Sequence, residues 1–383
     1  MSDTPHRIHG LAGNEVAPDW APITSREVNA VLAHYPDAGT FRSIDWHSPR
    51  PLSAACLVQT TGGSFFLKRH HESVRPGTTL EDEHRFMHTL REHGVPVPRV
   101  LSNSDNASAT WIGDWVYELH ERASGVDLYR DAFSWQPLDN AAHARTAGTM
   151  LASLHDASEA HTAAQRNTHI LVARIELIAS VDPVATLRRQ LPERPALATY
   201  MHDTDKANAW HAALAPWHAA VQPHLAQQPP LWTHGDWHVS NLCWSDAGEN
   251  ASITSVLDFG LAARTFALFD LATAIERNAI AWLDLDGARP ARADIALALI
   301  QGYHQRRPLS SCDLDVLAAL LPIVHVDFAL SEVEYYQGIT QSRADADVAW
   351  HTFLLGHMAW FKTTDGVILL DAIRNAHGRF VLQ

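Results

Sequence analysis

The stretch from Thr233 to Leu261, THGDWHVSNLCWSDAGENASITSVLDFGL, constrains the fold more than any other part of this chain of 383 residues. A short polar segment that carries Asp236 and Asn241 is followed by turn-forming residues around Gly248. An apolar run, predicted to be a strand over residues 253–257, then leads into Asp258. A hairpin of this kind brings two carboxylates and one amide side chain together.

These three side chains suit phosphoryl transfer from a metal-bound nucleotide. An aspartate that accepts the proton of a substrate hydroxyl must lie beside ligands for Mg²⁺, which prefers oxygen donors in near-octahedral geometry. The sequence therefore predicts Asp236 as the catalytic base, and Asn241 and Asp258 as metal ligands. The predicted cofactors are ATP and Mg²⁺.

The order His-x-Asp-x-x-x-x-Asn followed by Asp-Phe-Gly resembles the catalytic-loop and metal-loop signature of the protein-kinase fold. This resemblance implies a bilobal α+β fold with a small antiparallel-sheet N-terminal lobe and a largely helical C-terminal lobe. Residues 1–22 are predicted to be a tail and residues 23–119 the nucleotide-binding lobe. Residues 120–383 would form the helical lobe, with the catalytic loop and the acceptor site.

The segments before the catalytic loop fit this division. Apolar runs over residues 54–61 and 64–70 flank a Gly-Gly turn and predict a β-hairpin, with Lys68 in its second strand. Residues 80–93 have helical periodicity, and Glu83 lies on this predicted helix. Glu83 is the expected ion-pair partner of Lys68, which would position the lysine on the nucleotide phosphates.

The loop before this hairpin, residues 47–55, contains no glycine. Phosphate contact is therefore expected from backbone amides or from Ser53. The motif Gly-x-x-x-x-Gly-Lys-Ser/Thr is absent from the whole chain, which excludes a Walker-type NTPase.

The remainder of the chain is predicted to be mainly helical. After one strand at residues 111–119 and a hinge at 120–125, helices are expected at 141–157, 171–181, 205–225, 269–282, 295–306, 313–338 and 345–361. A further helix is expected at 26–35, capped by Thr24 or Ser25. Three acidic residues on the helix at 313–338 are expected to face solvent, with contact to an ammonium group as the alternative: Asp327, Glu332 and Glu334.

Composition excludes several kinds of partner. A net charge of -14 and a pI near 5.9 argue against a nucleic-acid partner, because its phosphates would be repelled. The N-terminus lacks a signal-peptide core, and no run is expected to be long and apolar enough to cross a membrane. Three scattered cysteines, Cys56, Cys243 and Cys312, indicate neither a disulfide framework nor a zinc knuckle. The expected location is the cytoplasm.

The motifs HGDWHVSN and VLDFG, the long insert before them and the missing glycine loop resemble the aminoglycoside phosphotransferase and choline kinase superfamily. Within it the chain is most similar to type II homoserine kinases, in stretches such as EHRFMHTLREHGVPVPRVL and VLDFGLAARTFALFDLATAIERNAIAW between about residues 23 and 340. Relatives often carry an asparagine where this chain has Ala55.

The resemblance implies transfer of the ATP γ-phosphate to a hydroxyl of a small molecule. It places the nucleotide-phosphate lysine at Lys68 with its partner at Glu83, and the base at Asp236. His234 would brace the catalytic loop rather than react, and Asp270 would support that loop from the following helix. Homoserine, choline or ethanolamine, an aminoglycoside and a sugar would all satisfy these residues.

Other classes of function use the same residues. His234, Asp236 and His238 supply ligand types for a zinc site, although a hydrolase of that kind would leave Asn241 and Asp258 unused. A catalytically inactive nucleotide-binding kinase fold and a Ser/Thr protein kinase are further alternatives. The helix expected close after Asp258 leaves little room for a peptide-binding activation segment. A serine hydrolase is not supported, because no Gly-x-Ser-x-Gly motif occurs.

Overall fold

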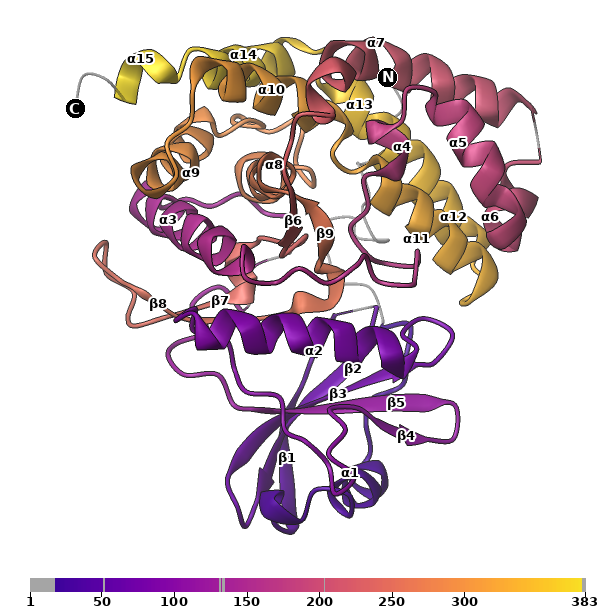
Figure 1. Ribbon diagram of the computed structural model, residues 1–383, viewed down its shortest axis with the longest axis vertical. Helices are drawn as coiled ribbons and strands as arrows, with labels where there is room; N and C mark the ends of the chain where they lie inside the picture. Colours follow the sequence, from indigo (N-terminus) through magenta and orange to yellow (C-terminus); the bar gives the residue numbers. More distant parts are fainter. Residues whose placement is uncertain (1–17, 51, 131, 133–134, 203, 381–383) are drawn as a thin grey trace.

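The computed structural model describes residues 18–380 except 51, 131, 133–134 and 203. It divides into a sheet-containing part and a helical part, which lie at the bottom and the top of Figure 1. Most of the predicted N-terminal tail, residues 1–17, lies outside the described residues.

The N-terminal part is built on a five-stranded antiparallel sheet in the order β1-β2-β3-β5-β4. Its strands are β1 (Phe41–His47), β2 (Ala54–Thr60), β3 (Ser64–His71), β4 (Thr110–Ile112) and β5 (Trp115–Glu121). Its helices are α1 (Ser25–Leu32), the short η1 (Pro36–Ala38) and α2 (Gly77–Glu92). Thr24 caps α1 through a capping box with Glu27, as the sequence predicts.

Residues 111–119 were expected to form one strand, and this prediction is wrong. The segment is divided into β4 and β5, because Gly113 adopts a left-handed conformation with φ +62° and reverses the chain. β5 continues past the predicted lobe boundary at 119 to Glu121. The connection that follows is tied to the C-terminal part, since Ser124 N donates to Ser255 Oγ at 3.1 Å.

The helical part also contains two short antiparallel sheets of two strands each. They pair β6 (Pro230–Thr233) with β9 (Ala263–Phe266), and β7 (Leu242–Trp244) with β8 (Ile253–Val256). The helices are α3 (Ala141–Ser158), α4 (Glu176–Ala179), α5 (Pro183–Gln190), α6 (Pro195–Tyr200), α7 (Thr204–Leu225), α8 (Ala267–Ala279), α9 (Ala293–Arg306), α10 (Ser311–Leu320), α11 (Val326–Gly338), α12 (Arg343–Val348), α13 (His357–Trp360), α14 (Thr364–Arg374) and α15 (His377–Phe380). Short 3₁₀ segments are η2 (Leu191–Glu193), η3 (Val239–Asn241), η4 (Phe259–Leu261) and η5 (Leu321–Ile323), and η6 (Ala349–Gly356) is a π-helix.

Four helix predictions need correction. Residues 313–338 form two helices, α10 and α11, because Pro322 lies in η5 between them. Residues 345–361 are α12 and α13 joined by the π-helix η6. In the segment 171–181 only α4 is helical, and α8 begins at Ala267, earlier than the predicted 269.

The expectation that no segment is suited to crossing a membrane is also wrong by length and composition. The stretch Ser311–Gly338 meets both criteria, but its most apolar window is 94% buried inside the protein, as expected for core helices.

The acidic residues of α11 were expected to face solvent, and they do not. Asp327, Glu332 and Glu334 are 5%, 0% and 4% exposed, because α6, α12 and η6 cover α11.

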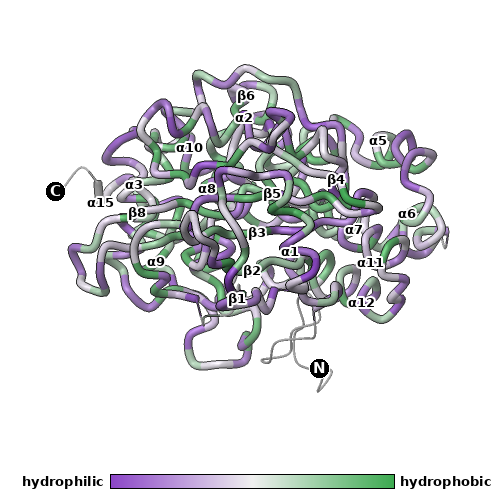
Figure 2. The backbone as a smooth tube through the Cα atoms, turned by 90° about the horizontal axis from the view of Figure 1, so that it is seen from below, coloured by the Kyte–Doolittle hydropathy of each residue, from purple (hydrophilic) through white to green (hydrophobic). Residues whose placement is uncertain are grey.

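Apolar segments gather toward the middle of the molecule and hydrophilic ones toward its outline (Figure 2). The largest cluster of buried apolar residues lies in the helical part, where α3 packs on α9. Two glycines allow the close approach of these helices. A Cβ atom on Gly148 would lie 2.0 Å from Leu299 O, and one on Gly302 would lie 1.9 Å from Arg145 O.

We therefore expect Gly302→Val to lower the free energy of unfolding by about 3 kcal/mol, because the added side chain forces α3 and α9 apart. The measurement is urea denaturation. Gln305→Val places the same side chain on an exposed site of α9 and should cost about 0.5 kcal/mol. Equal losses in the two variants would contradict the account of this helix contact.

Candidate active site

The predicted hairpin between the catalytic loop and Asp258 is confirmed. The loop leaves β6, passes through η3 and enters β7, and β8 returns to Asp258. Leu257 N donates to Asn241 O at 2.8 Å, so the two predicted metal ligands, Asn241 and Asp258, lie at the same end of the hairpin. Asp258 itself has a left-handed backbone with φ +56°, a conformation that costs energy for a residue other than glycine.

A buried carboxylate, that of Asp270 on α8, holds the catalytic loop. Its Oδ2 accepts from His234 N and its Oδ1 from Gly235 N, each at 2.9 Å. His155 Nε2 lies 3.0 Å from Oδ2, and the side chains of His155 and Asp270 are completely buried. Burial acts to raise the pKa of Asp270, but the hydrogen bond and charge of His155 outweigh it and lower that pKa. The geometry thus supports the predicted role of Asp270.

The predicted bracing position of His234 also has geometric support. Its Nε2 lies 2.8 Å from Leu257 O, and its Nδ1 accepts from Asp236 N at 3.2 Å. Because a carbonyl oxygen can only accept, Nε2 carries the hydrogen. Both ring nitrogens are therefore occupied in joining the loop to the end of β8, and neither is directed at a substrate.

The carboxylate of Asp236 has two polar neighbours. Asn241 Nδ2 donates to Asp236 Oδ2 at 3.3 Å and to its backbone oxygen at 3.0 Å. Arg277 Nη2 lies 3.3 Å from Asp236 Oδ1, and the guanidinium lies 3.8 Å from the centre of the Trp135 ring. The sequence analysis missed Arg277. Its spacing from Asp270 is close to two helical turns, which places both residues on the face of α8 that meets the loop.

Lys68 joins the sheet to the end of the hairpin. Its Nζ lies 2.9 Å from Asp258 Oδ1 and 3.9 Å from Glu118 Oε1. Burial acts to lower the pKa of Lys68, but the carboxylates of Asp258, Glu118 and Glu83 raise it. The Lys68 ammonium, 2.9 Å away, lowers the pKa of Asp258 to about 2. The lysine is thus charged and directed at the predicted metal ligand.

The predicted ion pair between Lys68 and Glu83 is wrong in this structure. Glu83 Oε2 pairs with Arg166 Nη2 at 3.0 Å, and Arg166 Nη1 donates to the carbonyl oxygens of Gly260 and Ala262 at 2.9 and 3.0 Å. Glu83 therefore ties α2 to the segment after Asp258. Glu118 approaches Lys68 instead, because the two residues are direct cross-strand neighbours on β3 and β5.

Glu118 is held by three histidines that the sequence analysis did not connect. His70 Nε2 lies 2.9 Å from Oε1, and His84 and His120 Nε2 lie 2.6 and 2.8 Å from Oε2. Burial raises the pKa of Glu118, but His120 and the other histidines outweigh this and lower it well below the usual range. A buried carboxylate with three hydrogen-bond donors keeps its position next to Lys68.

The glycine-free loop before β2 reaches the catalytic loop through Arg50. Arg50 Nη2 donates to Ala132 O at 3.2 Å and to Ser240 Oγ at 3.4 Å. Ser53 is partly buried directly before β2, and its predicted contact with phosphate stays a prediction. Arg50 adds a cation on the same loop that the sequence analysis did not single out.

The zinc alternative finds no support in the geometry. Among the described residues, two groups could hold a metal ion, His84 with Glu118 and His120, and Glu276 with His325 and His357. Neither includes the His-x-Asp-x-His residues. His238 Nδ1 instead accepts from Ser240 N at 3.2 Å.

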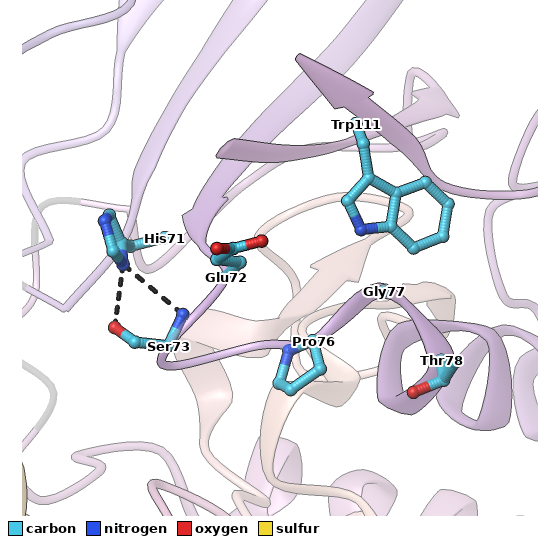
Figure 3. A pocket seen from close by; sticks show the side chains of 7 residues that line it. All are labelled: His71, Glu72, Ser73, Pro76, Gly77, Thr78 and Trp111. Carbon is cyan, nitrogen blue, oxygen red and sulfur yellow. Dashed lines mark hydrogen bonds between the residues drawn. The ribbon is translucent and has the colours of Figure 1, made fainter. Parts of the chain in front are cut away.

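The larger of two described cavities, about 380 Å³, opens where β3 ends and α2 begins (Figure 3). Its walls are His71, Glu72, Ser73, Pro76, Gly77, Thr78 and Trp111. In Figure 3, His71 is hydrogen-bonded to Ser73, at 2.7 Å between Nδ1 and Oγ. None of the predicted site residues lines this cavity, so we do not assign it to the active site.

We expect Asp270→Asn to lower kcat about 100-fold, because the amide cannot accept from both loop amides and His155 at once. Steady-state turnover and the free energy of unfolding should both fall. Asp246→Asn, in an exposed turn, serves as the matched control and should change neither quantity. Full turnover in Asp270→Asn would contradict the proposed support of the loop.

Two buried carboxyl groups predict a pH dependence of stability. Burial raises the pKa of Asp327 to about 7 and that of Glu276 to about 8. The folded protein therefore binds more protons than the unfolded chain between about pH 4 and pH 8, and these groups lower the free energy of unfolding as pH rises through that range. Buried histidines such as His325, whose pKa burial lowers to about 4, act in the opposite direction.

Because these groups act in opposite directions, the test compares the pH dependence of the free energy of unfolding in a variant and in the wild type. Asp327→Asn should gain stability relative to the wild type on going from pH 5 to pH 8, on the order of 3 kcal/mol. Asp294→Asn is the control, because the arginine beside this half-exposed group lowers its pKa. Parallel curves for wild type and Asp327→Asn in urea denaturation would refute the raised pKa.

Comparison with known proteins identifies the family of this chain. Residues 52–309 match the model of the phosphotransferase enzyme family. The homoserine kinase of Caulobacter sp. (strain K31) is 25% identical over 305 residues, which are 79% of this chain and 83% of that protein. The homoserine kinase of Zymomonas mobilis subsp. mobilis (strain ATCC 31821 / ZM4 / CP4) is 23% identical over 324 residues, covering 82% and 87%.

Solved structures share the fold. A microcompartment-associated aminopropanol kinase superposes with a TM-score of 0.60 at 19% identity, over 90% of this chain and 100% of that one. An amicoumacin kinase, in complex with AMP-PNP, Ca²⁺ and Ami, superposes with a TM-score of 0.56 at 14% identity, over 88% of this chain and 94% of that one. The predicted kinase-like α+β fold is thereby confirmed. Since the family model covers most of the chain, this protein belongs to the phosphotransferase enzyme family.

Proposed function

We propose that this protein transfers the γ-phosphate of ATP to a hydroxyl group of a small molecule, with Asp236 as the base. One observation carries the assignment: Asp236, Asn241 and Asp258 converge at one end of a hairpin, and Lys68 reaches it from the sheet. We place the nucleotide between the proposed lobes, residues 23–119 and 120–383, where Lys68 meets Asp258. The AMP-PNP bound to the amicoumacin kinase supports the use of a nucleotide.

The donor set fits a Mg²⁺ ion. Asn241 uses its amide nitrogen for Asp236, which leaves its oxygen to a metal, and the Asp258 side chain is 46% exposed. Both are the hard oxygen ligands that Mg²⁺ prefers. When bound, the ion would neutralise charge on the β- and γ-phosphates.

The chain's own residues perform the remaining tasks. Lys68 binds phosphate oxygens, with Glu118 keeping the ammonium in position. Asp236 orients the acceptor hydroxyl and takes its proton while the hydroxyl oxygen bonds to the γ-phosphorus and the bond to the ADP oxygen breaks. Arg277 lies beside Asp236 and helps to hold its side chain in position.

For the acceptor we propose homoserine or a similar small alcohol. The support is the likeness to two homoserine kinases over most of each chain. A protein substrate is less well supported, because β9 and α8 begin directly after η4 and leave no long activation segment. An aminoglycoside, choline, ethanolamine and a sugar are the other acceptors that the same site residues could serve.

The free thiols Cys56, Cys243 and Cys312 support a reducing, cytoplasmic location.

We expect Asp236→Asn and Asp258→Ala each to lose at least about 1,000-fold in turnover, because one removes the base and the other a metal ligand. The measurement is ADP release from MgATP with homoserine, 3-amino-1-propanol, choline, ethanolamine, an aminoglycoside and a hexose. Circular dichroism checks folding, and Asp246→Asn is the control. Undiminished turnover in either variant would refute the assignment.

A further inference from the structure

A second, small cavity lies behind the catalytic loop. Its volume is about 20 Å³, which is room for about one water molecule. Gly235 forms part of its wall and directly precedes Asp236, so the cavity begins next to the proposed base. Further lining residues come from α8, the start of α11 and η6: Glu276, Arg277, His325, Phe328 and Phe353. An ammonium group has nearly the size of a water molecule.

His325 presents an unused hydrogen-bond acceptor in this cavity. Its Nε2 lies 3.1 Å from Leu354 O, and because a carbonyl oxygen can only accept, Nε2 carries the hydrogen. Nδ1 therefore offers a lone pair, and it has no hydrogen-bond partner although the residue is 3% exposed. A buried acceptor without a donor is costly, so the site favours a ligand that brings N–H groups.

Glu276 supplies a second acceptor, 3.8 Å from His325 Nδ1 and 2% exposed. His357 Nδ1 lies 3.0 Å from Glu276 Oε1 and fixes the carboxyl group. The other charge on the wall, Arg277, is engaged by Asp236 and by the Trp135 ring. Phe328 and Phe353 complete the lining with aromatic rings, which can attract a cation.

We propose that this cavity binds the protonated amine of the acceptor, with Glu276 and His325 Nδ1 accepting its hydrogen bonds. The proposal rests on the proposed function and narrows it to short amino alcohols and hydroxy amino acids. Gly235, in the cavity wall, is adjacent to Asp236 in the chain. An acceptor with its amine in the cavity and its hydroxyl at Asp236 must therefore be short. Glu276 is thus a specificity-determining residue, and Asp236 remains the base.

The protonation of Glu276 should make the affinity of this site for an amine depend on pH. Burial, with the charges of Asp236 and Glu332, raises the pKa of Glu276 to about 8 despite the opposing charge of Arg277. His325 and His357 are the other titratable groups that face it. An ammonium binds the ionised carboxylate better, so affinity for an amine should rise from pH 6 to pH 8.5, and this rise should disappear in Glu276→Gln.

The test is isothermal titration calorimetry with the full chain and two matched pairs of acceptors. Homoserine is compared with 4-hydroxybutanoate, and 3-amino-1-propanol with 1-propanol, so that each pair differs in the amine. The wild type should bind the amine of each pair about 10- to 100-fold more tightly. Glu276→Gln should lose that preference, whereas Asp327→Asn, a buried carboxyl outside the cavity wall, should keep it.

Equal binding within both pairs by the wild type would overturn the proposal, even if Glu276→Gln fails to fold. Stoichiometric Zn²⁺ binding that Glu276→Gln abolishes would also overturn it, since Glu276, His325 and His357 would then be metal ligands. Amine-selective binding without ADP release from MgATP would instead support the cavity and reject the proposed phosphotransfer. ADP release with the amine-free acceptors, at the same kcat/KM as with their amine partners, would support the proposed phosphotransfer and reject the amine cavity.

Discussion

The hydrogen bonds from the catalytic-loop backbone to Asp270 are the interaction on which the rest of the site depends. Asp270 is buried, paired with His155 and bonded to two consecutive amides of the loop. Asp270 lies on α8, and the same helix also carries Glu276 and Arg277. One rigid element thus positions the proposed base Asp236, its cationic neighbour Arg277 and the wall of the proposed amine cavity.

The charges around the cleft are balanced across the two parts of the fold. Lys68 lies between Glu118 of the sheet and Asp258 of the hairpin, while Glu83 and Arg166 join α2 to the segment after Asp258. The pairs Lys68–Glu118 and Arg166–Glu83 thus stand in place of the single pair that was expected between Lys68 and Glu83. Binding of a nucleotide would have to compete with Asp258 for the Lys68 ammonium.

The sequence alone predicted the kinase-like fold and the hairpin that brings Asn241 close to Asp258, because these depend on local order along the chain. It did not predict the partner of Lys68, since cross-strand register between β3 and β5 decides that contact. It also placed Glu332 and Glu334 in solvent. The exposure of a helix such as α11 depends on which helices pack against it, and spacing along one segment cannot show this.

The most direct test of the central claim is to identify the phosphorylated product. Phosphorus NMR of the purified protein with MgATP and homoserine should show the γ-phosphate signal replaced by a phosphomonoester coupled to CH₂ protons, in step with ADP formation. ATP consumption that yields inorganic phosphate alone, with homoserine and every other hydroxyl acceptor, would contradict the assignment of this protein as a small-molecule kinase.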